Sequence, residues 1–172
     1  MSTLRVNNVT DLAGASQLGS IIQVVQSTRT STASATGYNW GDMLEATITP
    51  GSTNNKILVM IQANIGSNVG YDMKARLTRN GTAIHIGDTA SNRPRVTTTI
   101  TQTYHSTNQY AADQAIINYL DSPATTSAVT YKLQFASYNT YVVYINRTGS
   151  DQNSTEYDGR GASSIILMEV KG

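Results

Sequence analysis

Cysteine does not occur anywhere in this chain of 172 residues. Its absence excludes disulfide bonds, thiolate metal sites and a cysteine nucleophile. Charge is also scarce, because 13% of the residues are charged, against about a quarter in a typical soluble domain. The 12 basic and 11 acidic residues form no block of one sign. Neither nucleic acid nor an anionic membrane surface is therefore an expected partner.

Long apolar stretches are missing as well. Every apolar run is far shorter than the roughly 20 residues that span a membrane, so we expect no membrane insertion. The first residues, Met1 to Arg5, lack the apolar core of a signal peptide. We therefore expect no export through a cleaved leader.

Hydroxyl and amide side chains take the place of the missing charges. Ser, Thr and Asn together make up about a third of the residues, which favours strands and turns. Apolar residues recur mostly with a period of two, as in half-buried strands. The ten segments predicted as strands are 20–26, 43–49, 56–61, 73–79, 82–88, 96–105, 115–120, 128–135, 141–147 and 163–170. One segment, Tyr110 to Leu120, has a helix as its alternative. Many short strands of this kind predict an all-β fold, either a two-sheet sandwich or a barrel.

Turn signals and composition divide the chain. Asn80-Gly81 lies between two predicted strands and predicts a tight hairpin. Residues 27–39 and 149–161 carry no periodic pattern and predict long surface loops. Residues 1–19 are polar, so we expect them to form an arm before a single domain over residues 20–172.

The arm carries a few apolar side chains at intervals of two or three residues. These are Leu4, Val6, Val9 and Leu12. An extended segment of this kind gains order by docking into a partner through backbone hydrogen bonds and small pockets. We therefore predict that these four residues attach the chain to a larger particle.

Three predicted strands are apolar on both faces. They are Ile57–Ile61, Tyr141–Ile145 and Ile165–Met168. Such strands are ordinarily covered on both sides, and no predicted helix is present to cover them. We therefore expect a second copy of the chain to do so, although long loops of the same chain are an alternative. The candidate subunit-interface residues are Leu58, Met60, Tyr131, Phe135, Ile166 and Met168.

Residues with catalytic or metal-binding chemistry form no recognisable constellation. His85 and His105 have no carboxylate pair near them in the sequence. Nucleophile elbows, P-loops and dinucleotide fingerprints are absent. Asp151 and Asp158 lie in one loop and could act as a carboxylate pair or hold calcium, but a solvated loop is the preferred interpretation. We predict a protein that is not an enzyme and that uses no metal and no cofactor.

Ten tyrosines remain, and tyrosine is enriched at recognition surfaces. Tyr138 and Tyr141 flank a turn, while Tyr157, Asp158 and Arg160 lie in the second long loop. The rings could stack on sugars while polar neighbours bind the hydroxyls. These five residues are therefore a candidate site for a host cell-surface glycan, with burial in the core or at an interface as the alternative for the tyrosines.

Several segments resemble tail-fibre-like and other virion structural proteins of tailed phages, above all marine and cyanobacterial ones. The matching segments are 2–11, 19–25, 46–50, 56–59, 79–82, 87–88, 120–131, 144–147 and 162–170. They span most of the chain and consist of strands and turns, and none of them is a catalytic signature.

The resemblance implies a ten-stranded, two-sheet jelly-roll sandwich similar to tumour necrosis factor and the complement globular head, which form homotrimers. In such a jelly roll the last strand lies within a sheet, beside the first. The resemblance also implies a homotrimeric virion protein whose arm binds other virion proteins. No long shaft separates arm and domain, so a short tail fibre or appendage for host adhesion is the preferred role. A capsid decoration protein and a carbohydrate-binding lectin-like module are the alternatives.

Overall fold

The computed structural model describes residues 19–68, 72–100 and 110–172. The arm residues Leu4, Val6, Val9 and Leu12 lie outside these ranges, as does His105. The described residues form eleven strands and no α-helix. The strands are β1 (Ile21–Arg29), β2 (Ala33–Thr36), β3 (Gly41–Ile48), β4 (Lys56–Ser67), β5 (Met73–Arg79), β6 (Thr82–Ile84), β7 (Thr98–Ile100), β8 (Ala112–Asp121), β9 (Val129–Ala136), β10 (Val142–Ile145) and β11 (Ser163–Val170). In this part of the chain no helix has the length and apolar character needed to cross a bilayer.

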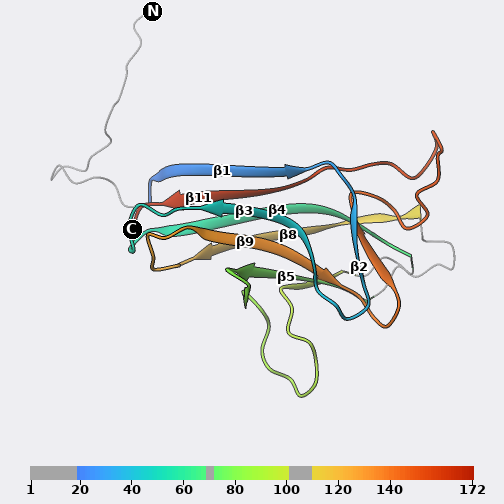
Figure 1. The fold of residues 1–172 in the computed structure, drawn as a ribbon, viewed down its shortest axis with the longest axis horizontal. Coiled ribbons are helices and arrows are strands. Elements are labelled where there is room, and N and C mark those ends of the chain that lie inside the picture. Colours follow the sequence, from blue (N-terminus) through green and yellow to red (C-terminus); the bar gives the residue numbers. More distant parts are fainter. Residues whose placement is uncertain (1–18, 69–71, 101–109) are drawn as a thin grey trace, which may run out of the picture.

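The strands form two antiparallel sheets, which confirms the predicted all-β, two-sheet architecture (Figure 1). Sheet I has the order β1-β11-β4-β10-β2, and β8 pairs with β4 along its other edge. Sheet II has the order β3-β9-β5-β6, and β7 also pairs with β5. Both sheets turn apolar faces inward, as in a β-sandwich.

The hairpin between β5 and β6 forms where the Asn-Gly pair predicted it. Asn80 and Gly81 have φ angles of 48° and 83°, and a two-residue hairpin turn of type I′ needs positive φ at both positions. The Asn80 side chain also accepts a hydrogen bond from the backbone N–H of Thr130 at 2.8 Å. This bond fixes the turn against the neighbouring strand β9.

The structure differs from the predicted strands chiefly in residues 27–39. The residues that were expected to form a loop over 27–39 instead extend β1 to Arg29 and form β2. The described chain therefore has eleven strands rather than ten. The segment with the helical alternative is strand β8, because pairing with the full length of β4 buries Ala115 and Ile117 and overrides the local helix propensity.

The core lies between the sheets and includes Tyr131 and Phe135, both of which are 0% exposed. Placing these two residues at a subunit interface was wrong. On β9 the odd-numbered side chains point inward, while Lys132 and Gln134 point outward. Apolar character alone did not indicate which face of the sheet each residue occupies.

A small polar network lies inside this core. The Tyr131 hydroxyl donates a hydrogen bond to the buried Asp121 carboxylate at 2.7 Å, and Arg79 donates to the same carboxylate at 2.9 Å. Burial, and next the hydrogen bond with Asp121, raise the pKa of Tyr131 far above its ordinary value. The phenol therefore remains a neutral donor, and the carboxylate has a cationic partner.

The two ends of the domain lie side by side. β11 lies between β1 and β4, as the resemblance predicted for the last strand. Gly19 donates a backbone hydrogen bond to Lys171 at 2.8 Å, and Lys171 donates one to Ser20 at 2.9 Å. The arm therefore joins the domain next to its C-terminus, at the end of the sandwich where β1 begins (Figure 1).

Candidate functional site

The outer face of sheet I is built from side chains that alternate with the core residues of β1, β11, β4 and β8. The strand registers place Val24 beside Met168, Met168 beside Leu58, and Leu58 beside Leu120. These four apolar side chains form a row across the four strands. The next two rows contain both apolar and amide or hydroxyl side chains, namely Gln26, Ile166, Met60 and Asn118, and then Thr28, Ser164, Gln62 and Ile116.

This apolar face is open to solvent in the single chain. Val24, Leu120 and Ile116 are 57%, 46% and 62% exposed. Met60, Ile116 and Ile166 line a groove of about 310 Å³ on the same face. No described segment of the chain covers Val24, Leu120 or Ile116, so these side chains remain in water unless another molecule binds to this face.

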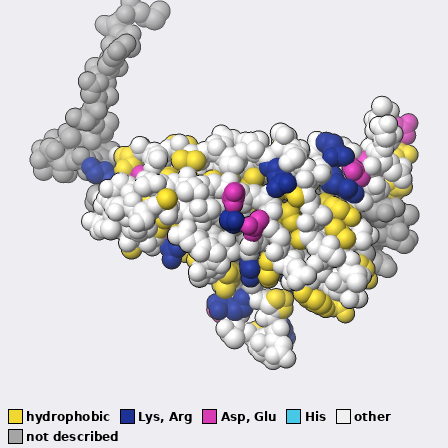
Figure 2. All heavy atoms as spheres, viewed as in Figure 1, with side chains coloured by type: hydrophobic (Ala, Val, Ile, Leu, Met, Phe, Trp, Pro, Cys, Tyr) yellow, Lys and Arg dark blue, Asp and Glu magenta, His cyan; other side chains and the backbone are white. Residues whose placement is uncertain are grey.

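The outer face of sheet II provides an internal comparison. Its edge strand β3 and the adjacent strand β9 present Asp42, Glu45, Thr47, Thr130, Lys132 and Gln134. The Lys132 ammonium lies 2.6 Å from Asp42 and 3.0 Å from Glu45, and charged side chains gather on this side of the molecule in Figure 2. This is the ordinary solvated face of an antiparallel sheet. The two sheets therefore differ, because only the outer face of sheet I is rich in apolar side chains.

The structure brings together four of the six predicted interface residues. Leu58, Met60, Ile166 and Met168 all lie on the outer face of sheet I. Sequence reasoning missed Val24, Ile116 and Leu120 on the same face. The last two were already visible as apolar residues at even positions of a segment whose odd positions, Ala115 and Ile117, were also apolar.

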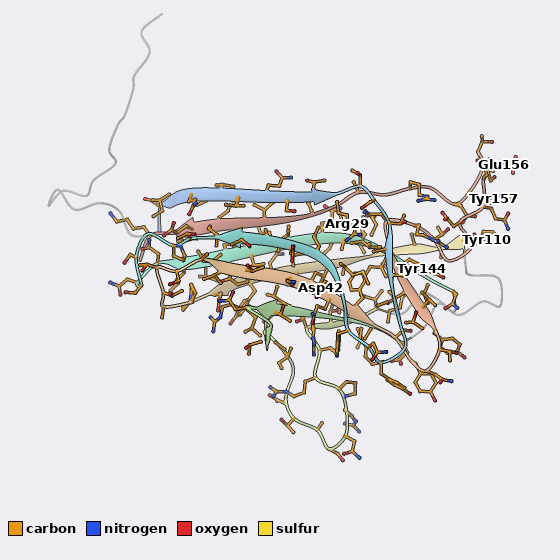
Figure 3. All side chains as sticks on the ribbon, in the orientation of Figure 1. Arg29, Asp42, Tyr110, Tyr144, Glu156 and Tyr157 are labelled. Carbon is orange, nitrogen blue, oxygen red and sulfur yellow. The ribbon has the colours of Figure 1, made fainter. Side chains whose placement is uncertain are left out.

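The predicted glycan site separates into two clusters in the structure. Tyr138 and Tyr141 lie near each other, with ring centroids 6.1 Å apart, and Tyr38 joins them at 5.7 Å from Tyr138. Tyr157 instead packs edge-on against Tyr110 at 5.3 Å (Figure 3). The described contacts place Tyr38, and not Tyr157, beside the turn that contains Tyr138.

Asp158 and Arg160 are engaged within their own loop. Asp158 accepts hydrogen bonds from the Thr148 and Ser150 hydroxyls and from the Gln152 N–H. Desolvation raises the pKa of Asp158, but these hydrogen bonds outweigh it and hold the pKa below the ordinary value. Arg160 forms an ion pair with Asp151 at 2.8 Å. These contacts order the loop and leave Asp158 little capacity to bind a ligand.

Residues with catalytic or metal-binding potential are dispersed. Within residues 19–68, 72–100 and 110–172, no group of three or more His, Asp or Glu side chains lies close enough to hold a metal ion. His85 stacks on Tyr119 with ring centroids 4.5 Å apart. The buried carboxylate of Asp121 is bound to Arg79 and Tyr131, and that of Glu169 to Gly51 and Asn55.

A scan against models of known protein families finds no match, and a comparison with curated proteins finds no significantly similar relative.

Proposed function

We propose that this chain is a non-enzymatic structural protein of a tailed-phage virion. It assembles as a homotrimer through the outer face of sheet I and is held on the particle by residues 1–19. The observation that carries the proposal is the contrast between the two outer faces, one apolar and one polar, on a single small sandwich. The virion assignment is supported by the resemblance of the segments quoted above.

Energetics favour another copy of the chain as the partner for this face. Fully burying one such aliphatic side chain contributes about 1.5–3 kcal/mol, whereas association costs about 4–15 kcal/mol. Val24, Leu58, Leu120, Ile166 and Met168 are adjacent across four strands, so one contact buries them together. A stable interface therefore needs most of this face, which a small soluble ligand would not cover.

The strand order supports a jelly roll. Four strands of sheet I are ordered β1-β11-β4-β8, and four of sheet II are ordered β3-β9-β5-β7. Along the chain, β3, β4 and β5 alternate between the sheets, as do β7, β8 and β9. Such repeated crossing between two sheets is typical of the double Greek-key jelly roll.

Light scattering coupled to size exclusion tests the assembly. The wild-type chain should have a mass of about three times 18.5 kDa. Leu120→Asp and Met60→Asp place charges on the apolar face and should give folded monomers. Thr130→Asp on the polar face is the matched control and should remain a trimer. A monomeric wild-type chain, or trimers of both charged variants, would contradict the proposed interface.

Virion location and attachment need a separate experiment. A chain lacking residues 2–18, expressed during infection, should still form trimers but should be missing from purified particles. Immunogold labelling of the full chain should mark the tail, whereas label on the head would favour the capsid decoration role. If purified particles carried the truncated chain at the wild-type copy number, the attachment site would lie on the sandwich and not on the arm.

A further inference from the structure

Two connections meet at the end of the sandwich opposite to Gly19 and the C-terminus (Figure 1). One runs from β2 to β3 and the other from β9 to β10. Gly37 donates a backbone hydrogen bond to Tyr141 at 2.8 Å, and Ser137 donates one to Gly37 at 2.7 Å. The two connections are therefore joined by main-chain bonds, although they are about a hundred residues apart in the sequence.

Three tyrosines gather at this junction. Tyr38 is 64% exposed and Tyr138 is 46% exposed. Their rings meet at 81° with centroids 5.7 Å apart, and the Tyr141 ring lies 6.1 Å from Tyr138 at 44°. We call Tyr38, Tyr138 and Tyr141 the tyrosine cluster. The cluster therefore places two exposed tyrosines, Tyr38 and Tyr138, and the half-buried Tyr141 at this tip.

The backbone beneath the cluster is closely packed. Gly37 has a φ of 61°, and a Cβ atom at this position would lie 2.0 Å from the Asn139 carbonyl oxygen. Only glycine allows this approach without displacing the other connection. Tyr141 also donates its backbone N–H to the Tyr138 carbonyl at 2.9 Å, which closes the turn. The backbone that carries the rings is thus held in place before a ligand binds. Binding would therefore lose little conformational entropy of the two connections.

The segments that carry the cluster are polar. Residues 33–41 and 136–146 contain no Asp, Glu, Lys or Arg. Two arginines from outside them lie against their rings, Arg76 on Trp40 at 4.1 Å and Arg147 on Tyr144 at 4.0 Å. Apart from Tyr38 and Tyr138, the exposed residues of the two segments are Ser34, Thr36, Asn39, Asn139 and Thr140. Hydroxyls and amides both donate and accept hydrogen bonds. None of the exposed residues in these two segments is aliphatic.

We infer that the tyrosine cluster binds a neutral saccharide. A sugar ring offers a C–H face that packs on an aromatic ring and hydroxyls that pair with amides and hydroxyls beside it. An anionic ligand is disfavoured because neither segment has a cation of its own and the two nearby arginines are engaged, Arg76 with Gln134 and Arg147 with Asp151. A protein partner is disfavoured because hot spots in protein interfaces are ringed by contacts that exclude water, whereas Asn39, Asn139 and Thr140 are open and hydrophilic.

The inference is independent of the proposed trimer, because none of the three tyrosines lies on the outer face of sheet I. A trimer would nevertheless present three copies of the cluster, and multivalency would strengthen attachment to a glycan-coated surface by about 10²–10⁴. The single site is expected to be weak, so binding must be measured in both monovalent and multivalent formats.

A glycan array of neutral and acidic microbial surface oligosaccharides tests the inference, followed by NMR titration with the best neutral oligosaccharide. The wild-type chain should bind a subset of the neutral glycans. Tyr38→Ala and Tyr138→Ala should each weaken that binding roughly tenfold. Tyr38→Phe, which keeps the ring, should retain most of it.

Tyr110→Ala is the matched control, because Tyr110 is also an exposed tyrosine at 40% but belongs to the pair with Tyr157. It should leave glycan binding unchanged. Melting temperatures and light scattering show that each variant is folded and has the wild-type mass, so a failed trimer is distinguished from a failed saccharide site. Three results would overturn the inference: no binding to any neutral glycan, wild-type affinity in both alanine variants, or binding only to acidic glycans.

Discussion

Strand β11 allows the fold to be tested with two neighbouring side chains. Leu167 is 0% exposed and lies in the core, where it pairs with Val25 on β1 and Val59 on β4. Met168, one residue later, points to the opposite face. Because side chains alternate along a strand, a one-residue error in register would exchange their environments. Replacing each of them with alanine therefore measures which face is the core.

The expected effects differ in size. Leu167→Ala removes a fully buried side chain from between two sheets, which should lower the free energy of unfolding by about 3–5 kcal/mol. At this chain length, that loss corresponds to a melting temperature lower by about 6–20 °C. Met168→Ala should cost the isolated chain about 1 kcal/mol or less, because surface substitutions have small effects. Its larger effect should be on the dissociation of the proposed trimer.

Urea denaturation followed by circular dichroism measures the free energy of unfolding. Light scattering over a dilution series measures dissociation of the assembly. Leu167→Ala should lower the unfolding midpoint at every protein concentration. Met168→Ala should lower the unfolding midpoint mainly at protein concentrations at which the wild-type chain is assembled. Equal losses for both variants in the monomer, or a larger loss for Met168→Ala, would refute the assigned inward and outward faces of β11.

Three further predictions concern the polar interior, the polar sheet and metal ions. Tyr131→Phe removes the donor to Asp121 and should lower the free energy of unfolding by about 1.5–3 kcal/mol in urea denaturation; a neutral effect would contradict the observed bond. The hydrogen bond from Lys132 lowers the pKa of Asp42 below its ordinary value of 3.8. The stabilisation from this pair should therefore be present above that pH and be lost as the pH falls through the lowered pKa; NMR titration should show the carboxyl pKa rising in Lys132→Ala, and an unchanged value would refute the pairing. EDTA should leave the melting temperature unchanged, since the described ranges hold no group of metal ligands; a fall that calcium restores would reveal a site.

Much of the fold follows from local patterns. All ten predicted strands have a counterpart in the structure, because alternating apolar residues and Asn-Gly turns act within a few neighbours. Strand β2 was missed because Ala33–Thr36 is a short run of small residues that pairs only with β10, more than a hundred positions away. Its strand conformation depends on that distant partner and not on its own side chains.

The candidate surfaces were harder to predict for the same reason. The pairing of β4 with β8 places Leu120 beside Leu58, and that register is a long-range property. Tyr38 meets Tyr138 only because β2 and β10 are neighbours in sheet I. Composition drew attention to the apolar strands and the tyrosines, but topology decides which of them share a surface.

The pairing of β1 with β11 also determines how the domain responds to mechanical force. Ile21 pairs with Val170 near the chain ends, and Arg29 pairs with Ser163 at the other end of the strand. A force that separates Gly19 from Gly172 breaks these cross-strand bonds one after another, which requires little force. A force between Gly19 and the tyrosine cluster runs along β1 and shears all of its bonds to β11 together (Figure 1). The domain should therefore resist a force between Gly19 and the tyrosine cluster far better than a force between Gly19 and Gly172.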